Sequence, residues 1–106
     1  MKIKVFHLAE NTQRNKSSEA LIKAIFEDQE HFFCYDSELK DLPLGYDKYR
    51  LEIDYYQNWG AILRLRKDNP RCRIYGYSAD RKVKVPKRIQ RCLDSLCFTF
   101  GYGDRR

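Results

Sequence analysis

The segment Leu51–Tyr77, LEIDYYQNWGAILRLRKDNPRCRIYGY, constrains the fold more than any other part of this chain of 106 residues. Apolar residues alternate with charged ones along it, and four arginines fall within the alternation. Alternation at every second residue is typical of a strand with one buried face, whereas a helix repeats its apolar residues every three or four positions. Tested as a helix, the segment places Arg66 on the same face as Ile62 and Leu63. The pattern therefore predicts strands.

Two turn signals divide this segment into three strands. Asn-Trp-Gly at residues 58–60 has the length and the final glycine of a three-residue hairpin loop, and Asp-Asn-Pro at residues 68–70 is typical of a turn. The hairpin would place Asp54 opposite Arg64, a cross-strand pair of opposite charges worth about 0.2–1 kcal/mol. We therefore predict a three-strand antiparallel meander with one apolar and one charged face.

The flanking segments complete the prediction of an α+β fold. Residues 2–8 and 31–36 are apolar enough for strands, and a helix that Ser17 would cap lies between them over residues 17–29. Its expected buried stripe is Ala20, Leu21, Ala24 and Ile25. Pro86 opens a second helix, with the expected stripe Ile89, Cys92, Leu93 and Leu96. We predict one domain over residues 1–106: strand, helix, strand, three-strand meander and C-terminal helix, followed by a short strand or apolar tail at 97–103.

The charge of the chain is divided unevenly along the sequence. Residues 1–60 hold 8 Lys or Arg and 11 Asp or Glu, which gives a net charge of −3. Residues 61–106 hold 13 Lys or Arg and 4 Asp or Glu, which gives +9. A field of this kind attracts polyanions or an acidic protein to the basic half, so we expect a partner from one of these two classes.

The predicted meander would collect arginines and tyrosines on its polar face, and a basic stretch follows it. Arginine binds phosphate in a forked geometry, and tyrosine rings stack on unpaired bases. We therefore predict a nucleic-acid-binding surface on the sheet and the C-terminal helix. Its residues are Arg64, Arg66, Arg71, Arg73, Tyr75, Tyr77, Arg81, Lys82, Lys84, Lys87, Arg88 and Arg91.

The favoured function is that of a non-catalytic regulatory or accessory protein that binds RNA or single-stranded DNA. One alternative is an adaptor whose basic half binds an acidic protein, and another is a small basic ribonuclease that uses Arg and Tyr side chains. We expect no enzyme activity and predict no catalytic residue, because no nucleophile and base stand at a recognisable spacing. His7 and His31 are expected to be structural. We predict neither a cofactor nor a metal site, since the four cysteines form no C-x-x-C pair.

The sequence also carries signals of location. MKIKVFHLAEN lacks the long apolar region of a signal peptide, and no apolar run approaches the roughly 20 residues of a membrane span. The four cysteines are then expected to be reduced thiols. We therefore predict a cytoplasmic protein with no membrane partner.

Three short motifs follow the strands in a familiar order: LAENTQRN at residues 8–15, Asp54, and Ser78-Ala79 within YSAD. They resemble the acidic turn after the first strand, the phospho-acceptor after the third and the Ser/Thr-Ala after the fourth in response-regulator receiver domains. The resemblance implies a parallel, flavodoxin-like α/β sheet with a helix over residues 59–67. It also implies an alternative function, that of an adaptor built on a degenerate receiver-like domain.

The chain departs from this family at several positions. The acidic pair is reduced to Glu10, and FTFGYG stands where the family has Lys-Pro. The second helix would have to contain Pro43 and Gly45. Arg50 and Glu52 would lie in a central parallel strand, which is ordinarily apolar on both sides. We therefore favour the antiparallel α+β fold, and the missing acid and lysine count against phosphoryl transfer in either fold.

Overall fold

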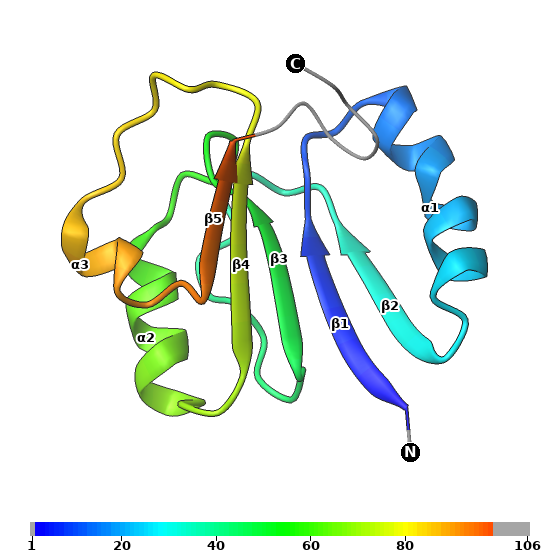
Figure 1. Cartoon of the computed structure of the whole chain (residues 1–106), viewed down its shortest axis with the longest axis horizontal. Coiled ribbons are helices and arrows are strands. Elements are labelled where there is room, and N and C mark those ends of the chain that lie inside the picture. Colours follow the sequence, from blue (N-terminus) through cyan, green and yellow to red (C-terminus); the bar gives the residue numbers. More distant parts are fainter. Residues whose placement is uncertain (1, 99–106) are drawn as a thin grey trace.

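The computed structural model describes residues 2–98, and its framework is a parallel sheet of five strands in the order β2-β1-β3-β4-β5 (Figure 1). Every neighbouring pair of strands is parallel. The strands are β1 (Ile3–Leu8), β2 (Gln29–Cys34), β3 (Lys48–Glu52), β4 (Arg73–Ser78) and β5 (Ser95–Phe98). The helices are α1 (Gln13–Ile25), α2 (Gly60–Asp68) and α3 (Lys87–Gln90).

The predicted antiparallel meander is wrong, because residues 60–68 form helix α2 between two parallel strands. The chain is therefore α/β and not α+β, and the alternative of a parallel flavodoxin-like sheet is confirmed. The misleading residue was Arg66, which falls on the apolar face of the helix. Its side chain is long enough to carry the guanidinium beyond that face to the backbone carbonyls of Pro70, Cys72 and Cys92.

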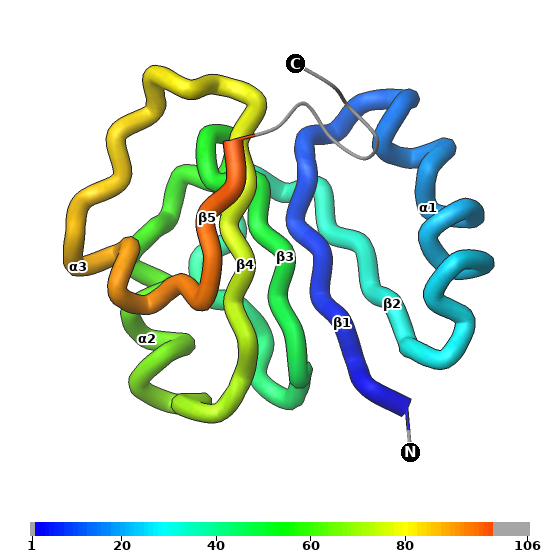
Figure 2. Tube along the Cα trace, in the orientation of Figure 1, coloured from blue at the N-terminus to red at the C-terminus, as the bar shows by residue number. Residues whose placement is uncertain are grey.

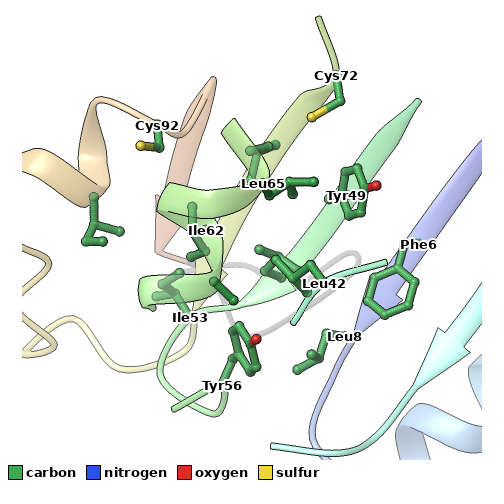
Figure 3. Packing of buried hydrophobic residues seen from close by; sticks show 14 of the residues in the cluster. Phe6, Leu8, Leu42, Tyr49, Ile53, Tyr56, Ile62, Leu65, Cys72 and Cys92 are labelled. Carbon is green, nitrogen blue, oxygen red and sulfur yellow. The ribbon is translucent and has the colours of Figure 1, made fainter. Parts of the chain in front are cut away.

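One face of the sheet builds the main hydrophobic core. Phe6, Leu8 and Tyr49 point from β1 and β3 into a buried cluster (Figure 3). Leu51 of β3 and Ile74 of β4 belong to the same cluster, which residues of α2 complete. From α2 the buried members are Ala61, Ile62 and Leu65. This spacing of one and three residues keeps them on one side of the helix, so α2 covers this face of the sheet.

A long loop takes the place of a helix between β2 and β3. Gly45 has a positive φ of 96°, a conformation that favours glycine, and Pro43 two residues earlier restricts the backbone further. The loop is tied to the core by side chains: the Tyr49 hydroxyl donates to the Pro43 carbonyl, and the Tyr56 hydroxyl donates to the Leu39 carbonyl. Residues 35–47 therefore follow a fixed course over the core without forming a helix, as the trace in Figure 2 shows.

The first helix lies on the other side of the sheet from α2 and α3 (Figure 1). It begins earlier than predicted: the Thr12 side chain caps it by accepting the Asn15 N–H. The predicted buried stripe is wrong, because Leu21 and Ile25 are each 61% exposed and Ile22 is the buried residue of the helix. No helix in the described part of the chain has the length and apolar character needed to cross a bilayer.

The C-terminal helix is shorter than predicted. α3 ends at Gln90, and Leu96 lies in β5. Leu93 and Leu96 both approach the backbone of Gly76, where a Cβ atom would stand 3.1 and 3.3 Å from their methyl groups. The predicted final strand at 97–103 begins within β5, and its residues 99–103 lie outside the described residues.

Candidate functional site

The carboxyl ends of the parallel strands meet at one edge of the sheet, where ligands of open α/β sheets ordinarily bind. β1 leads there to Glu10, and β3 ends there at Glu52. The backbone N–H of Glu10 donates to Glu52 Oε1 at 2.9 Å. The Glu52 carboxylate is thus tied to the loop that follows the neighbouring strand.

The residue that resembles the phospho-acceptor of receiver domains is Glu52 by its position in the fold, and not Asp54 as the sequence predicted. β3 ends at Glu52, whereas Asp54 lies two residues later in an exposed turn. The carboxylate at the end of the third strand is therefore that of Glu52 and not of Asp54. Burial raises the pKa of the Glu52 carboxyl above its ordinary value, although the hydrogen bond from Glu10 opposes the rise and the nearby Asp54 charge adds to it.

The serine at the end of β4 is fully engaged in its own turn. Ser78 is buried, and its hydroxyl accepts the Asp80 N–H at 2.9 Å and donates to the Asp80 carbonyl at 3.0 Å. An oxygen held in this way orders the loop after β4. The Ser78 hydroxyl proton is therefore directed to the Asp80 carbonyl and not toward the edge of the sheet.

The acidic residues of this edge are few among the described residues. Over residues 2–98 there is no group of three or more His, Cys, Asp or Glu side chains placed to hold a metal ion. The Glu52 carboxylate already accepts a backbone N–H.

The arginines predicted at positions 64 and 66 lie on α2 and are bound within the chain. Arg64 pairs with Asp41 at 2.7 Å and donates to the Lys40 carbonyl, which holds the loop before β3. Arg66 donates to three backbone carbonyls and pairs with Asp94 at 3.0 Å. Neither side chain lies on the polar face of the sheet.

The predicted residues of β4 do lie on one sheet face. Arg73, Tyr75 and Tyr77 alternate with buried neighbours and point to the side that carries α1, and Arg71 precedes the strand. Arg50 of β3 joins them, with its guanidinium 5.1 Å from the Tyr77 ring centroid. Sequence reasoning missed Arg50, although its alternation with Tyr49 and Leu51 was the available signal.

The second predicted cluster lies on the opposite side of the sheet. All six of its side chains are exposed, on the loop after β4 and on or beside α3: Arg81, Lys82, Lys84, Lys87, Arg88 and Arg91. Val85 and Ile89 anchor this segment in the core that α2 shares. The two predicted cationic clusters therefore do not form one surface.

Two histidines form a pair between β1 and β2. His7 Nε2 lies 2.9 Å from His31 Nδ1, and His31 Nε2 lies 3.1 Å from the Phe26 carbonyl. A carbonyl only accepts, so His31 donates from Nε2 to the Phe26 carbonyl. Burial, with smaller contributions from the Arg50 charge and His31, lowers the pKa of His7 to about 3.

Comparison with known proteins gives a fold without a family. No family model matches the chain, and no curated protein matches it. Among solved structures, the chain is similar to the response regulator protein TrrA from Thermotoga maritima in complex with Mg2+-BeF. The TM-score is 0.66 at 19% identity, over 97% of this chain and 90% of that one. The chain is thus a small α/β protein with the flavodoxin-like receiver fold.

The predicted function of nucleic-acid binding is corrected by these findings. It depended on a single cationic sheet wall that included Arg64 and Arg66, and both belong to helix α2 of a receiver fold. The RNA-platform interpretation of the tyrosines required the same antiparallel sheet. The adaptor alternative, which the receiver resemblance implied, is the one that agrees with the fold.

Proposed function

We propose that the chain is a receiver-like signalling domain that acts by binding another protein and does not transfer phosphoryl groups. The observation that carries this proposal is the edge of the receiver fold at which β3 ends. There a glutamate replaces the expected aspartate, and its carboxylate is bound to the Glu10 N–H.

The chemistry of phosphoryl transfer supports the same conclusion. A transferred phosphoryl group carries charge that positioned cations and hydrogen-bond donors must stabilise. The Ser78 hydroxyl is occupied by Asp80, and the acidic residues of the edge do not converge on a cation site within residues 2–98. The Glu52 carboxylate joins the end of β3 to the loop after β1, so we propose a non-catalytic domain.

The partner that we propose is an acidic protein. The basic surface of Arg81, Lys82, Lys84, Lys87, Arg88 and Arg91 is exposed, and the sequence between residues 81 and 91 contains no acidic residue. A patch of one sign accelerates association with a partner of the opposite sign and rejects partners of the same sign. Four free thiols, at Cys34, Cys72, Cys92 and Cys97, support a reducing, cytoplasmic setting.

The experiment is an affinity capture from nuclease-treated lysate, followed by titration of the purified partner. We expect one acidic protein whose recovery is unaffected by nuclease. The triple variant Arg81→Gln, Lys82→Gln, Lys84→Gln should weaken binding by about tenfold or more at low salt. The matched control is Lys2→Gln, Lys4→Gln, Arg14→Gln, which removes three exposed charges from the acidic half. Equal weakening by both variants, or recovery that nuclease abolishes, would contradict the proposal.

A further inference from the structure

A cavity of about 290 Å³ lies on the side of the sheet that carries α1. Its lining comes from α1 and the following turn, from Val5 and His7 of β1, and from the first three residues of β2, β3 and β4. Neither Glu52 nor Ser78, at the carboxyl ends of β3 and β4, is among the lining residues. The cavity is therefore distinct from the edge that carries Glu52 and Ser78, and a ligand here would go beyond the proposed function.

The two sides of the cavity differ in polarity. Ile22 and Phe26, from α1 and the residue that caps its end, form an apolar wall on the helix side of the cavity. Lys48 and Arg50 reach this face from β3, where Lys48 is the neighbour of Val5 and Arg50 that of His7 in the parallel register. A ligand that fills such a space needs an apolar body and a charged end.

The charge of the lining is of one sign. Lys48 and Arg50 are cationic, and none of the nine lining residues is Asp or Glu. For the Lys48 ammonium, no ion pair exists within residues 2–98. Burial lowers the pKa of the Arg50 guanidinium, although the Tyr77 and Cys97 side chains oppose this. Partial removal from water strengthens the attraction between such a cation and an anion.

The lining also contains polar side chains that can form hydrogen bonds. The Tyr75 hydroxyl has no hydrogen-bond partner among the described residues and is able to donate. His7 stays neutral at neutral pH, since burial lowers its pKa to about 3. His7 therefore adds no positive charge of its own, and an anion beside it would raise its pKa.

We propose that this cavity binds a small aromatic carboxylate, with the carboxylate between Lys48 and Arg50 and the ring against Phe26 and Ile22. The volume lies at the lower end of the roughly 300–1,000 Å³ typical of ligand pockets, which restricts the ligand to about one ring. Free inorganic phosphate would match the cations and leave the apolar wall unused. A bound ligand would join α1 to β3 and β4 on this face.

The test is a titration of the full chain with benzoate. It is monitored by ¹⁵N–¹H NMR of the backbone amides and by NMR of the histidine imidazole rings. We expect saturable shifts at the amides of Ile22, Phe26 and Lys48, together with a rise in the pKa of His7. Benzylamine, which has the same ring with the opposite charge, should cause neither change. Inorganic phosphate should bind more weakly than benzoate.

Matched charge variants locate the site. Lys48→Gln and Arg50→Gln should each weaken benzoate binding by about tenfold, the effect of losing one charge-assisted hydrogen bond. Arg73→Gln is the control, because Arg73 is the neighbour of Lys48 in the parallel register and points to the same face without lining the cavity. Should Arg50→Gln fail to fold, Lys48→Gln alone carries the comparison. The proposal is overturned if benzoate causes no saturable shift, if benzylamine binds equally, or if Arg73→Gln weakens binding as much as Lys48→Gln.

Discussion

The two faces of the sheet come from the same strands and have opposite characters. On the side of α2 and α3, β1 and β3 present Phe6, Leu8 and Leu51, all buried in one apolar cluster. On the side of α1, the alternating residues of β3 include Arg50 and Glu52. Central parallel strands are ordinarily apolar on both faces because helices cover both. The difference teaches that the face under α2 and α3 specifies the fold, whereas the face under α1 carries polar groups that the core does not require.

The largest expected effect on the free energy of unfolding comes from shortening a buried side chain of β4 on the core face. Ile74 is fully buried, so Ile74→Ala should lower the free energy of unfolding by about 2–5 kcal/mol through lost burial and a residual cavity. Arg73→Ala, one residue earlier and exposed on the opposite face, should change it by less than about 0.5 kcal/mol. Urea denaturation measures both values. Equal losses for the two variants would abolish the distinction between the faces.

The next largest effect on the free energy of unfolding distinguishes Arg66 from Arg64, which both lie on α2. Arg66→Met should lower the free energy of unfolding by about 2–3 kcal/mol, because it leaves the carbonyls of Cys72 and Cys92 without their donor. Arg64→Met should cost less than about 1 kcal/mol, since Arg64 and its partner Asp41 are both largely exposed. The same denaturation experiment compares the two variants. A result in the reverse order would show that Arg66 is not the structural arginine.

A pH dependence tests the buried polar group on the α1 face. The pKa of His7 is lowered to about 3 in the folded chain from 6.5, so the unfolded chain binds the extra proton first as pH falls. The stabilisation from neutral His7 is therefore complete above pH 6.5 and is lost as the pH falls from 6.5 toward 3. Between pH 7 and 5 the loss should be about 2 kcal/mol by proton linkage.

The variant His7→Gln keeps a donor for His31 and removes the titration. Its free energy of unfolding should fall less between pH 7 and pH 5 than that of the unaltered chain, and the difference between the two falls isolates the contribution of His7. Identical pH profiles for both proteins would mean that His7 is accessible to protons and water in the folded chain.

The smallest effect is expected on the outer side of α1. Leu21 is 61% exposed, so Leu21→Gln should change the free energy of unfolding by less than about 0.5 kcal/mol. The measurement is repeated at low and high protein concentration. A loss above about 1 kcal/mol that depends on concentration would show that this side of α1 is covered by a second copy of the chain.

The sequence predicted local features of the sheet better than its assembly. The strand at residues 2–8 and the alternation of Arg73, Tyr75 and Tyr77 are both observed. Alternation sets which face a residue occupies, but it does not set whether neighbouring strands run parallel or antiparallel. That direction depends on α2, which was hidden because Arg66 interrupts its apolar stripe.

The candidate sites were harder to predict for the same reason. The cavity joins Val5, Lys48 and Tyr75 from three strands that are distant in sequence, and only the parallel register brings them together. At the edge of the sheet, the resemblance pointed to Asp54, whereas the end of β3 is at Glu52. A shift of two residues keeps the alternation intact, so the pattern alone could not distinguish the two carboxylates.

The central claim is that the sheet edge with Glu52 and Ser78 does not accept a phosphoryl group. The most direct test is to expose the chain to a phosphoryl donor. The purified protein is incubated with acetyl phosphate and MgCl2, and its intact mass and its ¹⁵N–¹H spectrum are recorded. We predict an unchanged mass and no saturable shift at the amides of Glu10 and Ser78, because the Glu52 carboxylate and the Ser78 hydroxyl are already bound within the chain. Covalent addition of one phosphoryl group at Glu52 or Asp54 would contradict the account.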